Sequence, residues 1–326
     1  MENYDLKKGL ICGTIGVLGI SLQPIIANSR PSVIDPYIFA AVTALIMATI
    51  FFPLFVLERH KLKSSIDVDV NSNEKIYSLL NGWKKKNNLK FLVLIGITFS
   101  IVPVLLFLSF DLAGAINSSL TLKSEVFFAL LFGYIFLKEK RISKVQLLFC
   151  ATLFFGVFIA ITQGSLNLLE FNIGVLILLI DVALFTLMHT FTKSRFDRNE
   201  LSPIQVVFIR SLLSGLILFS TYFIFFPLDR INVVFNPNYF IYYLLMGLDY
   251  SVSLFLWYKT LSYIQIGKAG VINSVTPIIT ALFAWIILGD VFTIFHLVGM
   301  IIIIISIYMI VREKKLKKNP ILNEKK

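Results

Sequence analysis

The chain has 326 residues, of which 57% are hydrophobic, and its 31 Phe outnumber the 19 Asp and Glu together. A water-soluble domain of this length has too little interior to bury so many apolar side chains, so the composition excludes a soluble protein and predicts that lipid covers much of the surface. The formal net charge of +11 is compatible with nucleic-acid binding, but the placement of the basic residues indicates membrane topology instead.

Taken in chain order, ten apolar segments approach or exceed the roughly 20 residues that a helical membrane span requires. They are Gly9–Ile26, Pro36–Leu57, Phe91–Phe110, Ala113–Leu137, Val145–Thr162, Ile173–Thr192, Ile204–Phe226, Tyr239–Leu261, Ala269–Leu288 and Thr293–Val311. The least marked boundaries are those at Asp111 and near Gly267. The first segment lacks a small-residue cleavage site, so we expect it to be a retained span rather than a signal peptide.

Basic residues gather in every second loop between these segments. One side of the membrane receives Lys84–Lys86, Lys138–Arg141 and the tail from Arg312, whereas the other side receives only Arg30 and Arg230. Cytoplasmic loops carry an excess of Lys and Arg, so we expect a multi-pass protein of the cell (plasma or inner) membrane with both termini cytoplasmic. The lysines of the loop 58–90 are expected to contact anionic lipid headgroups, and no nucleic-acid partner is expected.

The chain contains an internal repeat. Ser119–Lys140 (SLTLKSEVFFALLFGYIFLKEK) and Gly270–Val291 (GVINSVTPIITALFAWIILGDV) each open with polar residues, continue as an apolar helix and end at an acidic step. The acidic residues are Glu139 and Asp290, which gives an offset of 290 − 139 = 151 residues. One further apolar helix follows each copy.

Five spans per copy is an odd number, so the second copy must lie upside down relative to the first. We therefore predict an all-α integral membrane protein whose ten transmembrane helices form two inverted five-helix repeats. Residues 1–162 form the first repeat, with its cytoplasmic loop 58–90, residues 163–311 form the second, inverted repeat, and residues 312–326 form a basic cytoplasmic tail. Repeats of this kind are typical of carriers, whose halves rock around a central site.

Four features of the sequence belong together as a set. They are the acidic steps at Glu139 and Asp290, the glycine-containing helices Gln146–Ile161 and His296–Val311, the segment Leu256–Leu261 (LWYKTL), and the segment Pro203–Arg210. The set resembles the EamA-type permeases of the drug/metabolite transporter superfamily, over about Gly9–Val311. The resemblance implies transport of a small organic solute, often an amino acid or related metabolite, without selecting one substrate or a direction of transport.

The chain departs from the family pattern at three places. Lys138 replaces a glycine that Gly289 keeps in the second repeat. Val126 stands opposite Pro277 at the offset of 151. Pro36 corresponds to Pro203, so Thr43 stands in the first repeat where Arg210 stands in the second.

Charged side chains within spans are candidate functional groups, because each costs about 2.5–3.5 kcal/mol at the bilayer centre on insertion scales. The central ones are Lys123, Glu125, Asp181 and Asp249. Arg210 lies nearer the predicted cytoplasmic end, from which its long side chain can reach the interface. We treat the first four as candidates for the transport path.

The fourth span carries a polar face composed of Asn117, Ser118, Thr121, Ser124 and Glu125. At 100° per residue, Lys123 lies about 160° round the helix from Glu125, so we expect the two to line different walls. Lys123 is expected to pair with Asp181 or Asp249, and a structural ion pair and a substrate contact have equal weight for it. Glu125 is expected to be the titrating group of a proton-coupled cycle, with a helix–helix contact as the alternative.

The ninth span repeats this polar face without the charge. Asn273, Thr276 and Thr280 share one side with Pro277, and Thr276 corresponds to Glu125 at the offset of 151. Pro277 frees a backbone carbonyl that is available to a substrate or coupling ion, although a packing kink is the commoner role of such a proline.

Three further candidates lie on one stripe of the eighth span: Asp249, Ser253 and Trp257. An acid among aromatic rings suits a cationic or aromatic solute. Gln23, before Pro24 in the first span, either adds a polar contact or only marks the end of that helix. His60, His189 and His296 are interpreted as structural.

The sequence offers no support for enzyme chemistry. It contains no HExxH, no Gly-rich phosphate loop, no CxxC and no GxSxG motif. Cys12 and Cys150 lie within spans and are expected to be packing residues, so no metal or other cofactor is expected. A non-transporting receptor or scaffold, a channel and an intramembrane enzyme remain alternatives in that order, and a homodimer is compatible with the sequence.

Overall fold

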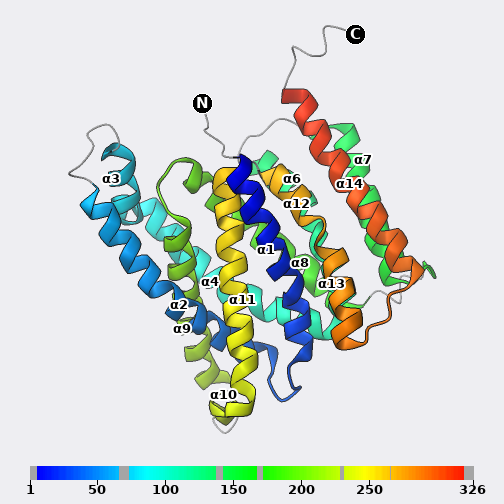
Figure 1. The fold of residues 1–326 in the computed structure, drawn as a ribbon, viewed down its shortest axis with the longest axis horizontal. Helices are drawn as coiled ribbons and strands as arrows, with labels where there is room; N and C mark the ends of the chain where they lie inside the picture. Colours follow the sequence, from blue (N-terminus) through cyan, green and yellow to red (C-terminus); the bar gives the residue numbers. More distant parts are fainter. Residues whose placement is uncertain are drawn as a thin grey trace.

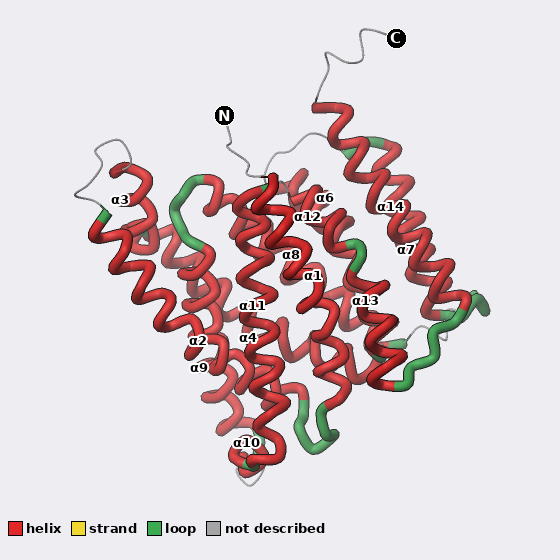
Figure 2. Tube along the Cα trace, in the orientation of Figure 1, coloured by secondary structure: helices red, strands yellow, loops and turns green. Residues whose placement is uncertain are grey.

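The structure, a computed structural model, describes residues 6–65, 73–136, 142–166, 172–227, 231–264 and 266–318. In these residues the regular structure is entirely helical (Figures 1 and 2). The helices are α1 (Leu6–Ser29), α2 (Pro36–Ser64), α3 (Asn73–Asn81), α4 (Lys86–Ala113), α5 (Ala115–Thr121), α6 (Glu125–Phe136), α7 (Lys144–Ile161), α8 (Ile173–Asp197), α9 (Pro203–Phe225), α10 (Asn232–Phe235), α11 (Pro237–Tyr263), α12 (Ile266–Asn273), α13 (Thr276–Phe283) and α14 (Ile294–Lys318).

Ten helical segments of the described chain are long and apolar enough to cross a membrane, with α5–α6 and α12–α13 each counted as one. The predicted fold class, ten transmembrane helices in two inverted repeats, is thereby confirmed. Large apolar side chains face outward along them, and Leu147, Ile180 and Trp285 are each at least 60% exposed. These side chains would be unfavourable in water and are suited to lipid.

Helix starts in both halves use the same local chemistry. Asp35 caps α2 and Ser202 caps α9, and in each case a proline follows at the first helical position. A side-chain oxygen at the cap accepts a hydrogen bond from an otherwise unpaired backbone N–H, and proline has no N–H to leave unpaired. The shared pattern agrees with the correspondence of the second and seventh spans.

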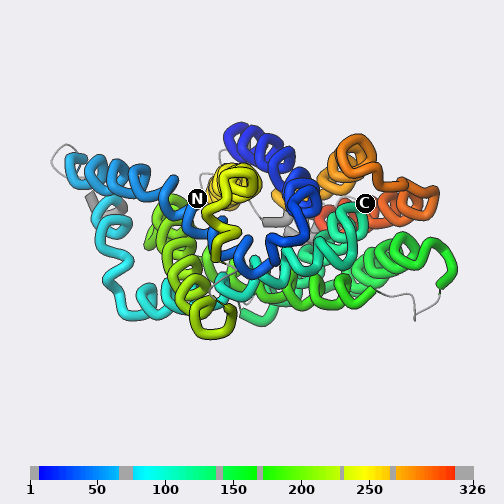
Figure 3. The backbone as a smooth tube through the Cα atoms, turned by 90° about the horizontal axis from the view of Figure 1, so that it is seen from below, coloured from blue at the N-terminus to red at the C-terminus, as the bar shows by residue number. Residues whose placement is uncertain are grey.

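The helices pack in pairs that respect this correspondence. The second span packs on the seventh (α2 on α9) and the fifth on the tenth (α7 on α14), while α1 packs on α11 and α4 on α8. If each span is replaced by its counterpart in the other repeat, the pair α1–α11 becomes α8–α4, and the pairs α2–α9 and α7–α14 become themselves. The same four pairs result, as a two-fold relation between the repeats requires. Seen from below, the bundle is elongated rather than round (Figure 3).

The pair α7–α14 crosses closely at two glycines. A Cβ added to Gly299 would lie 2.5 Å from the carbonyl oxygen of Gly156, and one added to Gly156 would lie 2.9 Å from that of Gly299. Small residues allow helix backbones to approach in membranes, where van der Waals packing drives association. These two glycines therefore allow the backbones of the fifth and tenth spans to approach closely.

The start of α1, helix α3 and the end of α14 lie at the same end of the bundle (Figure 1). Helix α3 belongs to the loop 58–90 and packs on α2. The carbonyl oxygen of Gly82, just after α3, accepts a hydrogen bond from Asn88 Nδ2 at 2.9 Å. Part of this loop is therefore a short helix that packs against a membrane-spanning helix. The step at Glu139, the basic run Lys138–Arg141, residue Arg230 and the tail beyond residue 318 lie outside the described residues.

Candidate functional site

The fourth and ninth spans are both interrupted, and at equivalent positions. The fourth span passes from α5 through a 3-10 turn, Leu122–Ser124, into α6, which begins at Glu125. The ninth span passes from α12 through a turn into α13, which begins at Thr276, and Figure 2 shows the interruption as a loop. The two restarts are 276 − 125 = 151 residues apart, the offset of the sequence repeat.

The two interruptions meet each other across the halves. Lys123 Nζ donates to the backbone oxygen of Asn273 at 2.8 Å, and Asn273 Nδ2 donates to Glu125 Oε1 at 2.6 Å. Thr276 Oγ1 also donates to the Asn273 backbone oxygen at 2.8 Å. We call Lys123, Glu125, Asn273 and Thr276 the junction.

Proline creates the acceptor at the junction. Pro277 has no N–H, so the carbonyl four residues earlier, that of Asn273, receives no backbone hydrogen bond from position 277. Lys123 donates to this carbonyl, so in this conformation the carbonyl is not free to bind a substrate or coupling ion. Because the lysine is 1% exposed, it holds the freed carbonyl away from water in this conformation.

Two expectations about Lys123 are wrong. The lysine pairs with neither Asp181 nor Asp249, because the described structure places its ammonium on Asn273 and within electrostatic reach of Glu125. It also does not line a different wall from Glu125. The intervening residues are a 3-10 turn, which advances about 120° per residue rather than 100°, and both side chains end on the same asparagine.

The remaining predicted residues of the fourth span lie elsewhere. Thr121 Oγ1 donates to the backbone oxygen of Asn117 at 2.8 Å. The Asn117 side chain lies 3.3 Å from His296 Nε2, in a polar cluster with Gln163 and Thr293. The structure therefore does not join Asn117 to Glu125 in one wall.

Gln23, Asp249 and Ser253 meet at the contact between α1 and α11. A Cβ at Gly19 would lie 2.0 Å from Ser253 Oγ and 3.0 Å from Asp249 Oδ1, so the backbone of α1 lies directly on these side chains. Gln23 lies close to Asp249. Trp257, one turn beyond Ser253, has its ring centroid 6.5 Å from that of His189.

Asp181 in α8 is fully buried, and neither of its carboxylate oxygens has a hydrogen-bond partner among the described residues. It lies close to Tyr250 of α11. The predicted path residues therefore form four groups: at the junction, at the contact between α1 and α11, at the contact between α8 and α11, and around Asn117 and Thr121 in α5.

A further site, which the sequence does not predict, surrounds Arg210. This arginine does not reach the interface, because it is 2% exposed. It lies 3.5 Å above the ring centroid of Phe99 and donates to the hydroxyls of Tyr258 at 3.0 Å and Tyr250 at 3.5 Å. One feature of the sequence pointed to this site. Thr43 occupies in the first repeat the position that Arg210 occupies in the second, and the structure places both in the wall of one cavity.

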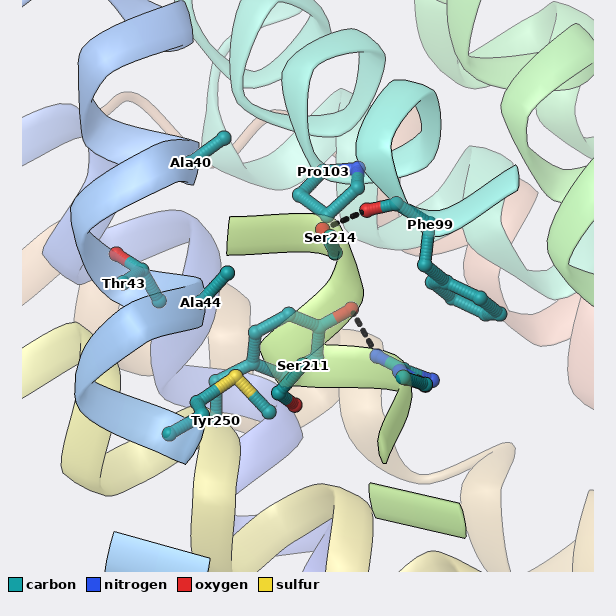
Figure 4. Close-up of a pocket in the computed structure, with 10 residues that line it drawn as sticks. Ala40, Thr43, Ala44, Phe99, Pro103, Ser211, Ser214 and Tyr250 are labelled. Atoms are coloured by element: carbon teal, nitrogen blue, oxygen red, sulfur yellow. Dashed lines mark hydrogen bonds between the residues drawn. The ribbon is translucent and has the colours of Figure 1, made fainter. Parts of the chain in front are cut away.

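This cavity lies between the two repeats (Figure 4). Helices α2 and α4 of the first repeat line it together with α9 and α11 of the second, through Ala40, Thr43, Ala44, Met47, Phe99, Pro103, Arg210, Ser211, Ser214 and Tyr250. Pro103 frees the carbonyl of Phe99, four residues earlier. Ser214 Oγ donates to that carbonyl at 2.5 Å, so here too a proline-freed carbonyl in one repeat is bound by the other.

An inverted-repeat bundle with interrupted spans that meet between its halves defines the class of membrane carriers. The chain matches the EamA-like transporter family over residues 7–162 and 172–312. It belongs to this family, the EamA-type branch of the drug/metabolite transporters, whose members are transporters rather than enzymes.

Two individual proteins illustrate the relationship. The uncharacterized transporter YetK of Bacillus subtilis (strain 168) is 24% identical over 183 residues, which are 55% of this chain and 53% of that protein. The match thus spans about half the length of this curated relative. A solved crystal structure aligns with a TM-score of 0.60 over 93% of this chain and 96% of its own, at 10% identity, which shows a shared fold.

Proposed function

We propose that this protein is a secondary transporter that moves a small organic metabolite, such as an amino acid or a related solute, across the cell membrane by alternating access. The observation that carries the proposal is the junction. Each repeat contributes one interrupted span at the same position, and the two interruptions bond to each other. Transporter sites are typically built where interrupted spans of two repeats meet near the midplane.

The junction also suggests how access alternates. It joins α5–α6 of the first repeat to α12–α13 of the second, so the two repeats cannot separate there while both hydrogen bonds persist. Glu125 is the acceptor of one of them and faces the charge of Lys123. Protonating Glu125 would remove a charge-assisted hydrogen bond and the attraction to Lys123. Glu125 is therefore our candidate for proton coupling.

Counterflow in proteoliposomes tests the proposal. Vesicles containing the full chain are loaded with a mixture of proteinogenic amino acids and related carboxylic and amine metabolites, and each solute outside is followed by mass spectrometry. We expect at least one solute to exchange in a saturable, protein-dependent way, and protein-free vesicles serve as the control. If a solute binds to the protein but none exchanges, the receptor or scaffold alternative is correct and the proposal fails.

A further inference from the structure

The two arginines that are buried in the described part of the chain have very different surroundings. Arg30 donates to the backbone oxygens of Ile34 and Ala27 and forms an ion pair with Asp111 at 2.5 Å. Its guanidinium also lies over the ring of Phe39. Each of its three nitrogens donates a hydrogen bond and its charge is paired with an acid inside the protein, as expected of a structural arginine.

Arg210 is just as buried but is not neutralised. A guanidinium has five N–H donors, and Arg210 makes two hydrogen bonds, both to neutral tyrosine hydroxyls. No acid forms an ion pair with it among the described residues. Tyr250 also lies close to the buried Asp181, and the ring of His189 packs against Phe99 and Tyr258 beside the guanidinium.

Other polar groups around the cavity are also without partners. Thr43 Oγ1 and Ser211 Oγ are buried, and neither has a hydrogen-bond partner in the described structure. Both residues line the cavity with Arg210 (Figure 4). Buried hydroxyls normally find partners inside a protein. An arginine with spare donors and two unpartnered hydroxyls thus face one space, which otherwise has apolar and aromatic walls.

We infer that this cavity is the anchoring subsite for the carboxylate group of the transported solute, an inference that rests on the proposed function. The guanidinium fork can bind a carboxylate with two parallel hydrogen bonds, and Thr43 and Ser211 can donate to the remaining lone pairs. Because Thr43 belongs to the first repeat and Arg210 to the second, a bound carboxylate contacts both halves.

The charge of the site selects the class of anion. Arg210 is the only charged residue among those that line the cavity in the described chain. A carboxylate brings one negative charge and neutralises it, whereas a phosphate monoester brings nearly two and would leave an uncompensated charge in the membrane interior. The site therefore favours a monocarboxylate over a phosphate.

The size of the cavity indicates that the solute enters in another conformation. The cavity offers about 10 Å³, close to the minimum for one water molecule. Its walls come from both repeats, and Ser214 of the second repeat binds the Phe99 carbonyl of the first. Rocking of one repeat against the other would break this contact and open the space.

Binding to the purified full-length protein tests the inference. The probes are isovalerate, phenylacetate and L-leucine, each beside its carboxamide, together with inorganic phosphate, and the readouts are thermal stabilisation and calorimetric titration. We expect at least one carboxylate to bind at least tenfold more tightly than its amide, and phosphate not to bind. Equal binding of every acid and its amide, or preferential binding of phosphate, would overturn the inference.

Variants of the site test the assignment through the ratio of acid to amide binding, which is measured within each folded variant. Arg210→Gln should abolish the preference for the acid over the amide, and Arg210→Lys, which keeps the charge but not the fork, should retain only part of it. Thr43→Val leaves the arginine in place and should weaken carboxylate binding several-fold. Retention of the full preference in Arg210→Gln or in Thr43→Val would contradict the assignment.

The two proposals fail in different ways. Carboxylate binding that depends on Arg210, without any solute flux, would refute the transport function and leave the subsite standing. Flux of a solute that lacks a carboxylate, unchanged by Arg210→Gln, would refute the subsite and leave the transport function standing.

Discussion

Replacing Lys123 by methionine tests the junction most sharply, because the structure and the sequence assign this lysine different partners. The substitution removes the donor to the Asn273 carbonyl and the positive charge facing Glu125. It keeps most of the length and apolar volume of the buried side chain. The effect on stability should therefore report the lost polar contacts rather than a cavity.

The expected loss in the free energy of unfolding depends on which hydrogen bonds remain after the lysine is removed. A hydrogen bond from a charged group contributes about 1.5–3 kcal/mol, and breaking a buried ion pair from one side costs about 3–5 kcal/mol. The Asn273 carbonyl keeps its bond from Thr276, and Glu125, which is half-buried, keeps its bond from Asn273. We therefore expect Lys123→Met to lower the free energy of unfolding by about 2–3 kcal/mol.

The assay is equilibrium unfolding in mixed micelles, with second substitutions as the comparison. Adding Glu125→Gln to Lys123→Met removes the stranded charge and should restore about 1 kcal/mol. Adding Asp181→Asn or Asp249→Asn should restore nothing, since neither acid contacts the lysine. Recovery with either aspartate variant and none with Glu125→Gln would refute the junction.

Three further predictions concern the scaffold. Gly299→Ala should lower the free energy of unfolding by about 1–3 kcal/mol, because the alanine Cβ would lie 2.5 Å from the Gly156 oxygen. The matched control is Gly270→Ala, whose Cβ would meet only Val126 at 3.7 Å. It should be close to neutral in the same unfolding assay. Arg30→Met should lower the free energy of unfolding by about 2–4 kcal/mol, because it leaves Asp111 and two backbone carbonyls without their partner. Asp111→Asn should lower it by less than half of that. Equal losses for the two variants would contradict the hydrogen bonds described for Arg30. In a variant without native cysteines, single cysteines at Ser64 and Leu166 should react with impermeant maleimide from the cytoplasmic and the external side respectively, and labelling of both from one side would contradict the topology.

The sequence predicted the architecture because membrane spans are long-range patterns. An apolar segment near the required length has few alternatives in a bilayer, and the offset of 151 residues identified the repeat that the interrupted helices share. The helices extend beyond the apolar segments, as α2 does to Ser64, because polar residues outside the lipid can still continue a helix.

The site was predicted only in part, for identifiable reasons. The residue types were informative, since Lys123, Glu125, Asn273 and Thr276 do meet. Their geometry was not, because a calculation at 100° per residue fails where Leu122–Ser124 forms a 3-10 turn. The partner of Lys123 is 150 residues away in the chain and is a backbone oxygen, for which side-chain patterns give no signal.

Arg210 shows a different limit of sequence reasoning. Its position suggested that the side chain reaches the interface, but Phe99, Tyr250 and Tyr258 enclose it. These rings come from α4 and α11, and only the packing of three spans brings them together. The correspondence of Thr43 with Arg210 was visible in the sequence, yet their presence in one cavity required the structure.

The most direct test of the account is solute flux driven by a proton gradient, compared between the wild-type chain and Glu125→Gln in proteoliposomes. The substitution preserves the shape and the hydrogen bond at the junction but cannot titrate. We expect a wild-type flux that follows the imposed gradient, and a variant that still exchanges solute in counterflow but no longer responds to the gradient. A variant whose flux follows the gradient as the wild type does, or a wild-type chain that moves no solute, would contradict the account.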